Sequence, residues 1–292
     1  MDLALRIVGI VTPVLIISAI GYLYGRFRRP DMTWTNRLCI ELLYPLLIFT
    51  AMASRDFHIL DFLPLIFGCV IIMLGSGLIA WGVSALFGYN PHAFVPPAMF
   101  ANVANMGLPL ALFAFGPAML PAAVALFMIC TLTNLTLGVR ICAPQAKLRG
   151  ILGAPLLWAT LLGVLMSLLG LSLPPWLAAS TGMLGDAAIP LGLFTLGVGF
   201  SGFHVKRWDI GIVGALLRPL AGLLVAWPLL MILPLTGPMR GMLLLNAALP
   251  PAVMNYILAE RYQQDPAMVS AIVVGGNIAS IFFVPLALYF AL

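Results

Sequence analysis

The sequence has little charge. Only 8% of its 292 residues are Asp, Glu, Lys or Arg, whereas 63% are hydrophobic, and the mean hydropathy is +1.12. A water-soluble globule needs more polar surface than this to cover itself. The scarcity of charge therefore excludes a soluble enzyme and a nucleic-acid-binding domain, and it places the chain in lipid.

Metal-binding and redox motifs are also missing. The chain has four cysteines and three histidines, and their spacing matches neither C-x-x-C nor a Cys/His ligand set. Cys39, Cys69, Cys130 and Cys142 lie within or at the ends of apolar segments, so we interpret them as small packing residues. No metal or other cofactor is expected.

Long apolar segments predict an all-α integral membrane protein with ten transmembrane helices, because roughly 20 apolar residues cross a hydrocarbon core. The loops between them are short. In the first segment the arginines follow the apolar run, so we expect a retained span rather than a cleaved signal peptide. The ten predicted spans are 3–25, 34–54, 61–87, 92–115, 118–141, 151–170, 179–202, 208–235, 238–260 and 266–291.

The positive charges predict the orientation. Ten is an even number, so both termini lie on one side. With the N-terminus outside, ten of the 14 Lys and Arg residues are inside and three are outside, as the positive-inside rule requires. We therefore expect both termini outside. The inner residues are Arg26, Arg28, Arg29, Arg37, Arg140, Lys147, Arg149, Lys206, Arg207 and Arg261, and the outer ones are Arg6, Arg55 and Arg240.

Matching motifs predict an internal repeat. The second span contains Glu41-x-x-x-Pro45 and the seventh contains Asp186-x-x-x-Pro190, each followed by Leu-x-x-Phe-Thr. Further matches occur in order, at offsets between 141 and 146. Because an offset of five spans reverses the direction of crossing, we expect two inverted five-helix repeats, residues 1–145 and 146–292.

The fourth and ninth spans carry the repeat motif with the most functional interest. Asn105-x-x-x-Pro109 is matched by Asn246-x-x-x-Pro250. Proline removes a backbone donor and interrupts a helix, and such breaks are tolerated in a membrane where they line a cavity. We expect two broken helices that cross, with half-helix N-termini and Asn donors that suit a carboxylate.

An alternative remains open, in which the prolines only kink packed helices and the Asn side chains bind neighbouring helices. Asn134 and Asn277, which match between the fifth and tenth spans, fit either interpretation. The candidate substrate-binding residues are Asn102, Asn105, Gly107, Pro109, Asn134, Asn246, Pro250, Pro251, Asn255 and Asn277.

The stretches Asn-x-x-Asn-x-Gly-Leu-Pro-Leu at 102–110 and Leu-Pro-Pro-Ala-Val-Met-Asn at 249–255 resemble the auxin efflux carrier family, and the resemblance covers the full length. It implies an elevator-type homodimer, with spans 1, 2, 6 and 7 as scaffold and spans 3–5 and 8–10 as transport domain. It also implies organic-anion substrates such as malate, malonate or auxin-like acids. The chain lacks the long cytoplasmic loop of many plant members, which favours a permease of a bacterial inner (plasma) membrane.

Three charged residues inside the predicted spans need a reason, because a charge near the bilayer centre costs about 2.5 to 3.5 kcal/mol. Glu41 and Asp186 could couple transport to H+ or Na+, but Glu41 could instead pair with Arg37 one turn earlier. Arg218 could attract an anionic substrate, or it could snorkel or satisfy a neighbouring helix end.

Two other functions compete with transport. Gly199-Phe200-Ser201-Gly202 matches the G-x-S-G of rhomboid-type proteases, but the histidine after it, His204, lies in the adjoining loop, so the motif indicates no enzyme. A channel is a closer rival, because broken helices also line pores. The composition and repeat together favour a secondary transporter.

Overall fold

The protein is described by a computed structural model that covers residues 2–54, 57–146, 153–203, 205 and 207–292. Some residues used in the predictions lie outside this range. These are the basic residues Arg55, Lys147, Arg149 and Lys206 and the loop histidine His204.

The first half of the chain forms helices in the predicted segments, interrupted by short π-helical turns. Pro45 and Pro109 each follow such a turn, where the wider winding accommodates the missing proline N–H. The elements are α1 (Leu3–Arg28), α2 (Thr33–Leu38), η1 (Cys39–Leu43), α3 (Tyr44–Met52), η2 (Ile59–Phe62), α4 (Leu63–Phe87), α5 (Pro91–Met99), η3 (Val103–Gly107), α6 (Leu108–Phe115), η4 (Pro117–Met119), α7 (Leu120–Thr133), η5 (Asn134–Gly138) and α8 (Val139–Cys142).

The second half repeats the pattern with fewer interruptions. Several of its helices begin at a proline, which is favoured in a first helical turn because its missing donor is not needed there. The elements are α9 (Pro155–Leu168), α10 (Pro175–Asp186), α11 (Ala188–Gly202), α12 (Trp208–Ile232), α13 (Pro238–Ala248), α14 (Met254–Arg261) and α15 (Pro266–Ala291).

Six helical stretches of the described chain are long and apolar enough to cross a membrane. They correspond to the first, third, fifth, seventh, eighth and tenth predicted spans. All of them except the fifth, Pro117–Cys142, carry exposed Leu, Ile, Phe or Trp side chains. The all-helical membrane protein predicted from composition is therefore confirmed. The other four predicted segments are shorter or more polar, or they are broken, as in α5–α6 and α13–α14.

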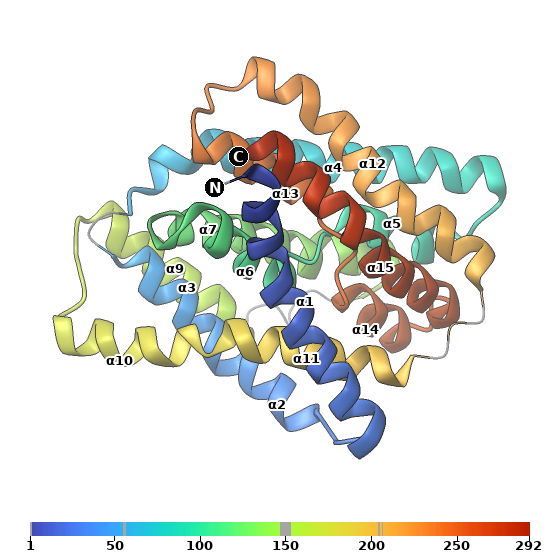
Figure 1. The fold of residues 1–292 in the computed structure, drawn as a ribbon, viewed down its shortest axis with the longest axis horizontal. Coiled ribbons are helices and arrows are strands. Elements are labelled where there is room, and N and C mark those ends of the chain that lie inside the picture. Colours follow the sequence, from blue (N-terminus) through green and yellow to red (C-terminus); the bar gives the residue numbers. More distant parts are fainter. Residues whose placement is uncertain (1, 55–56, 147–152, 204, 206) are drawn as a thin grey trace.

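Figure 1 shows α3, α9 and α10 at one side of the molecule and α4, α5 and α15 at the other. We call α1–α3 and α9–α11 the scaffold group, and α4–α8 and α12–α15 the transport group, after the predicted division. The most extensive contacts are α1 with α11 in the first group and α12 with α15 in the second. Glycines bring backbones together inside each group, as Gly21 does against Phe194 and Gly211 against Ala271.

The two chain ends lie at the same end of the bundle. Arg6 near the start of α1 donates a 3.3 Å hydrogen bond from Nη2 to the carbonyl of Ala114 in α6. A Cβ added at Gly241 of α13 would meet both Phe115 of α6 and Ala291 at the end of α15. This agrees with an even number of crossings, while the side of the membrane stays a prediction.

Candidate functional site

The two broken helices meet at their breaks. Ala101 and Pro251 form an isolated antiparallel bridge. The N–H of Asn102 donates to the carbonyl of Pro250 at 2.8 Å, and the N–H of Ala252 donates to the carbonyl of Phe100 at 3.0 Å. Backbone groups freed by each break are thus satisfied by the other break, which is how an unwound segment is tolerated inside a membrane.

This pairing corrects the register expected for the repeat. The motif match placed Asn105 opposite Asn246, at an offset of 141. In the two bridge hydrogen bonds, Asn102 and Ala252 are the equivalent donors, and Pro250 and Phe100 are the equivalent acceptors. Equivalent residues therefore lie 150 positions apart. The structural counterpart of Asn105 is therefore Asn255, because Asn105 is the fourth residue after Ala101 and Asn255 is the fourth residue after Pro251.

Pro109 is not at the break, contrary to the prediction. The fourth segment is interrupted after Met99, and helical structure resumes at Val103 and continues through Pro109 to Phe115. The π-helical turn η3 ends at Gly107, two residues before Pro109. Its wider winding accommodates the backbone N–H that proline lacks, so the helix continues through Pro109. In the ninth segment, Pro250 and Pro251 do lie in the break.

Two helix N-termini converge on the bridge, because the helix from Val103 and the helix from Met254 both start just after it. Each N-terminus carries a partial positive charge. Helices α5 and α13 also end at the bridge, but carbonyls at their C-termini already accept hydrogen bonds from protein donors. The Phe100 carbonyl after α5 accepts hydrogen bonds from the Ala252 N–H and from Asn255 Nδ2.

Arg218 occupies the end of α13. Its side chain is only 1% exposed, and it donates from Nη1 to the Ala247 carbonyl at 3.0 Å and from Nη2 to the Asn246 carbonyl at 3.5 Å. A guanidinium stabilises the negative end of a helix dipole. These contacts match the interpretation in which Arg218 satisfies the end of a neighbouring helix. They also place its charge beside the crossover.

A chain of carboxamides links the crossover to the fifth predicted span. Asn134 at the start of η5 donates from Nδ2 to Asn255 Oδ1 at 3.2 Å. Asn255 in turn donates from Nδ2 to the Phe100 carbonyl at 3.2 Å. Asn255 is 1% exposed. The two asparagines therefore tie α7–η5 to both halves of the crossover.

Asn277 makes a different contact from its predicted counterpart Asn134. It donates from Nδ2 to the Pro251 carbonyl at 3.3 Å and to the Val273 carbonyl at 2.8 Å within α15. Gly276 beside it lies so close to Pro251 that an added Cβ would overlap the proline ring. Asn277 thus holds the second break against α15.

The first break faces the scaffold group. Asn105, which is half-buried, accepts a 2.7 Å hydrogen bond at Oδ1 from the Tyr44 hydroxyl at the start of α3. The Asn102 side chain accepts from the Asn105 N–H at 3.4 Å and so caps η3. Asn105 is the candidate site residue that connects the two groups of helices.

Several buried polar atoms of the described crossover have no hydrogen-bond partner. Such atoms are rare in folded proteins, and each is available to a ligand or a water. They are Asn102 Nδ2, Asn134 Oδ1, Asn246 Oδ1, Asn277 Oδ1 and Arg218 Nε.

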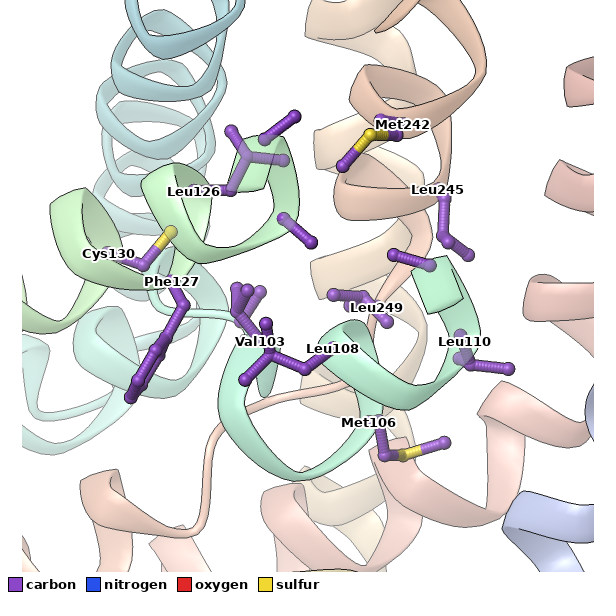
Figure 2. Packing of buried hydrophobic residues seen from close by; sticks show 14 of the residues in the cluster. Val103, Met106, Leu108, Leu110, Leu126, Phe127, Cys130, Met242, Leu245 and Leu249 are labelled. Carbon is purple, nitrogen blue, oxygen red and sulfur yellow. The ribbon is translucent and has the colours of Figure 1, made fainter. Parts of the chain in front are cut away.

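A small apolar hollow adjoins the crossover. Its volume is about 10 Å³, near the least space that holds one water molecule. Gly107 and Asn246 both line it, and Figure 2 shows Leu249 between Val103 and Leu108 on one side and Met242 and Leu245 on the other. This part of the crossover has no room for an organic anion in the present state.

The two intramembrane acids lie away from the crossover contacts. Glu41 accepts a hydrogen bond from Arg37 at 2.9 Å, and both side chains are exposed. Asp186 ends α10 and is also exposed. The pairing of Glu41 with Arg37 is one of the two interpretations drawn from sequence.

Comparison with known proteins identifies the class. A family model described as a membrane transport protein matches residues 139–288, just over half of the chain. The chain belongs to this family. An uncharacterized transporter of Methanothermobacter thermautotrophicus is 28% identical over 292 residues, with 94% of this chain and 95% of the relative covered. An uncharacterized transporter of Methanocaldococcus jannaschii is 23% identical, with 90% of this chain and 91% of the relative covered.

These matches confirm the resemblance to the auxin efflux carrier family and the assignment as an integral membrane transporter. Sequence reasoning missed two residues that the structure brings to the crossover, Tyr44 and Gly192. A signal for Tyr44 was present. In the repeated motif of the second and seventh spans, the residue before the proline is Tyr44 in one half and Ile189 in the other, so a lone hydroxyl interrupts an apolar run.

Proposed function

We propose that this protein is a secondary transporter of small organic anions that bind through a carboxylate at the crossover, and that it works by alternating access of the elevator type. The observation that carries the proposal is the antiparallel bridge of Ala101 and Pro251, which brings two helix N-termini to one place. Malate, malonate and auxin-like acids are the substrate candidates.

The electrostatics at the bridge favour an anion. Carbonyls at the negative helix ends already accept hydrogen bonds, from Arg218 at α13 and from Ala252 and Asn255 at α5. The N-terminal dipole ends, the unpartnered Asn102 Nδ2 and the buried Arg218 charge remain on the positive side, and the unpartnered oxygens of Asn134, Asn246 and Asn277 remain on the negative side. The full charge of Arg218 outweighs these neutral carboxamide dipoles, and in a low-dielectric interior it acts over several ångströms.

The packing supports two bodies that move against each other. Glycine contacts join helices inside the scaffold group, as at Gly197 with Ser18, and inside the transport group, as at Gly222 with Ala247. Such close backbone contacts resist sliding, because packed helices interlock. The contacts of α3 with α7 and of α1 with α6 lie between the groups, and we assign the moving surface to them.

The hollow beside Leu249 is too small for an organic anion, which supports a carrier whose site opens when helices rearrange. The protease alternative has less support, because the Ser201 hydroxyl donates to the Val198 carbonyl at 2.8 Å and packs against Gly25 of α1. Coupling to H+ or Na+ through Glu41 or Asp186 and assembly as a homodimer remain part of the proposal.

Counterflow in proteoliposomes tests the transport function. Vesicles loaded with unlabelled malate should accumulate labelled malate with saturable kinetics, and malonate and indole-3-acetate can be tried in the same format. Repeating the assay with H+ or Na+ gradients tests coupling. Single-channel currents would contradict the carrier mechanism.

Asn105→Ala tests the site. It removes a donor to the substrate carboxylate, and hydrogen bonds to charged groups contribute about 1.5 to 3 kcal/mol, so affinity should fall by roughly ten- to a hundredfold. Asn36→Ala, at an exposed position of α2, is the matched control. Equal affinity in the two variants would argue against binding at the crossover.

A further inference from the structure

Few polar side chains span the boundary between the scaffold and transport groups. The hydrogen bonds that cross it in the described chain include Arg6 to the Ala114 carbonyl, at 3.3 Å near the end of the bundle, and Tyr44 to Asn105, at 2.7 Å beside the crossover. The second is the shorter, and it joins a scaffold helix directly to a candidate substrate-binding residue.

The local fold holds Tyr44 in this position. The π-helical turn η1 ends at Leu43, immediately before Tyr44, and Pro45 follows it in the first turn of α3. The tyrosine ring is 7% exposed and packs against Phe127 of α7, with 5.2 Å between ring centroids. The side chain therefore crosses from the scaffold group into the transport group.

Gly192 of α11 provides the space for this contact. A Cβ added there would overlap the Tyr44 hydroxyl and lie 2.9 Å from Asn105 Oδ1. In the part of the chain that the structure describes, Gly192 is the one glycine whose nearest neighbours belong to both groups. Two scaffold helices are thus shaped around a single hydrogen bond to the transport group.

We propose that Tyr44 is a positioning residue that holds the transport group, through Asn105, in the arrangement that this structure shows, and that this bond breaks when the group moves. The inference rests on the proposed elevator function. A hydrogen bond of typical net strength changes a two-state equilibrium by about two- to tenfold. Loss of the hydroxyl should therefore shift the population of the two arrangements without removing the site.

Tyr44→Phe tests this, because it keeps the ring against Phe127 and removes only the hydroxyl. Thr50→Val is the matched control. Thr50 donates to Thr181 with the same 2.7 Å length, but both residues belong to the scaffold group. Spin labels at Leu171→Cys, in the loop before α10, and Thr236→Cys, in the loop before α13, report the distance between the groups, since Cys39, Cys69, Cys130 and Cys142 are buried.

In the full-length protein in lipid, Tyr44→Phe should raise the population of a second label distance by two- to tenfold, whereas Thr50→Val should match the parent. Gly192→Ala, which displaces the same contact from α11, should produce the same shift. Identical distance distributions for Tyr44→Phe and Thr50→Val would overturn the proposal.

Malate counterflow separates this proposal from the proposed function. Tyr44→Phe should change the transport rate and the apparent malate affinity by different factors, whereas a loss of stability alone would lower the amount of active protein and leave the affinity unchanged. If the parent transports malate and Tyr44→Phe behaves as Thr50→Val does, only the role of Tyr44 fails. If the parent transports none of the carboxylates, the proposed function fails even where the distances shift.

Discussion

The two breaks of the crossover share a backbone arrangement and differ in how their helix ends are satisfied. At the first break, the Phe100 carbonyl takes neutral donors from Ala252 and Asn255, and Asn105 faces the scaffold group through Tyr44. At the second, the end of α13 takes the charged side chain of Arg218 from inside the transport group. The difference indicates that two breaks with one backbone pairing have separate roles, because one holds the charge and the other meets the scaffold group.

The largest effect should come from removing that charge. Arg218→Met leaves the Ala247 and Asn246 carbonyls at the end of α13 without their donor, which should lower the free energy of unfolding by about 2 to 3 kcal/mol. Thermal unfolding in detergent measures this loss of stability. Arg240→Met, which changes an exposed arginine of α13, is the control. If the two variants were equally stable, the Arg218 charge would not stabilise the second break.

A smaller effect should come from crowding each break. Gly276→Ala places a methyl group against the rigid ring of Pro251, and overpacking of this kind costs about 1 to 3 kcal/mol. Gly107→Ala, at the end of η3 after the first break, meets the flexible end of Leu249 at 2.8 Å and should cost roughly 1 kcal/mol or less. Unfolding of both variants in the same detergent compares them. The reverse order would show that the first break is the more tightly packed one.

The smallest difference should separate the equivalent asparagines. Asn255→Ala removes hydrogen bonds to Phe100 and from Asn134, whereas Asn105→Ala removes the one from Tyr44. Asn255→Ala should therefore be less stable than Asn105→Ala by about 1 kcal/mol, as measured by thermal shift. Both variants should weaken malate binding. If only one of them does, the substrate contacts a single break.

The sequence was most informative about the helices and least informative about how they meet. Apolar length located the segments, because lipid permits little else, and the repeated motifs indicated that the halves are related. The sequence does not predict the register of the crossover, because the matching Asn and Pro residues differ in offset from the backbone pairing at Ala101 and Pro251. Pro109 looked like a break, but η3 accommodates it.

Side-chain partners could not be predicted from one sequence. Arg218 read equally well as a substrate ligand or a helix cap, and only the distances to Ala247 and Asn246 distinguish these uses. Tyr44 drew no attention because its partner, Asn105, is 61 residues away in the chain. Contacts of this kind depend on how helices pack in space, and the hydropathy pattern does not predict them.

The bridge also constrains how the protein is made. The Asn102 N–H and the Phe100 carbonyl pair with residues 250 and 252, which leave the ribosome about 150 residues later, or on the order of 10 to 30 s at ordinary rates of synthesis. Backbone groups without partners cost several kcal/mol each in hydrocarbon. During that interval the unwound segment around Ala101 needs shelter from lipid, so the insertion machinery must retain the first half of the chain until the second half arrives.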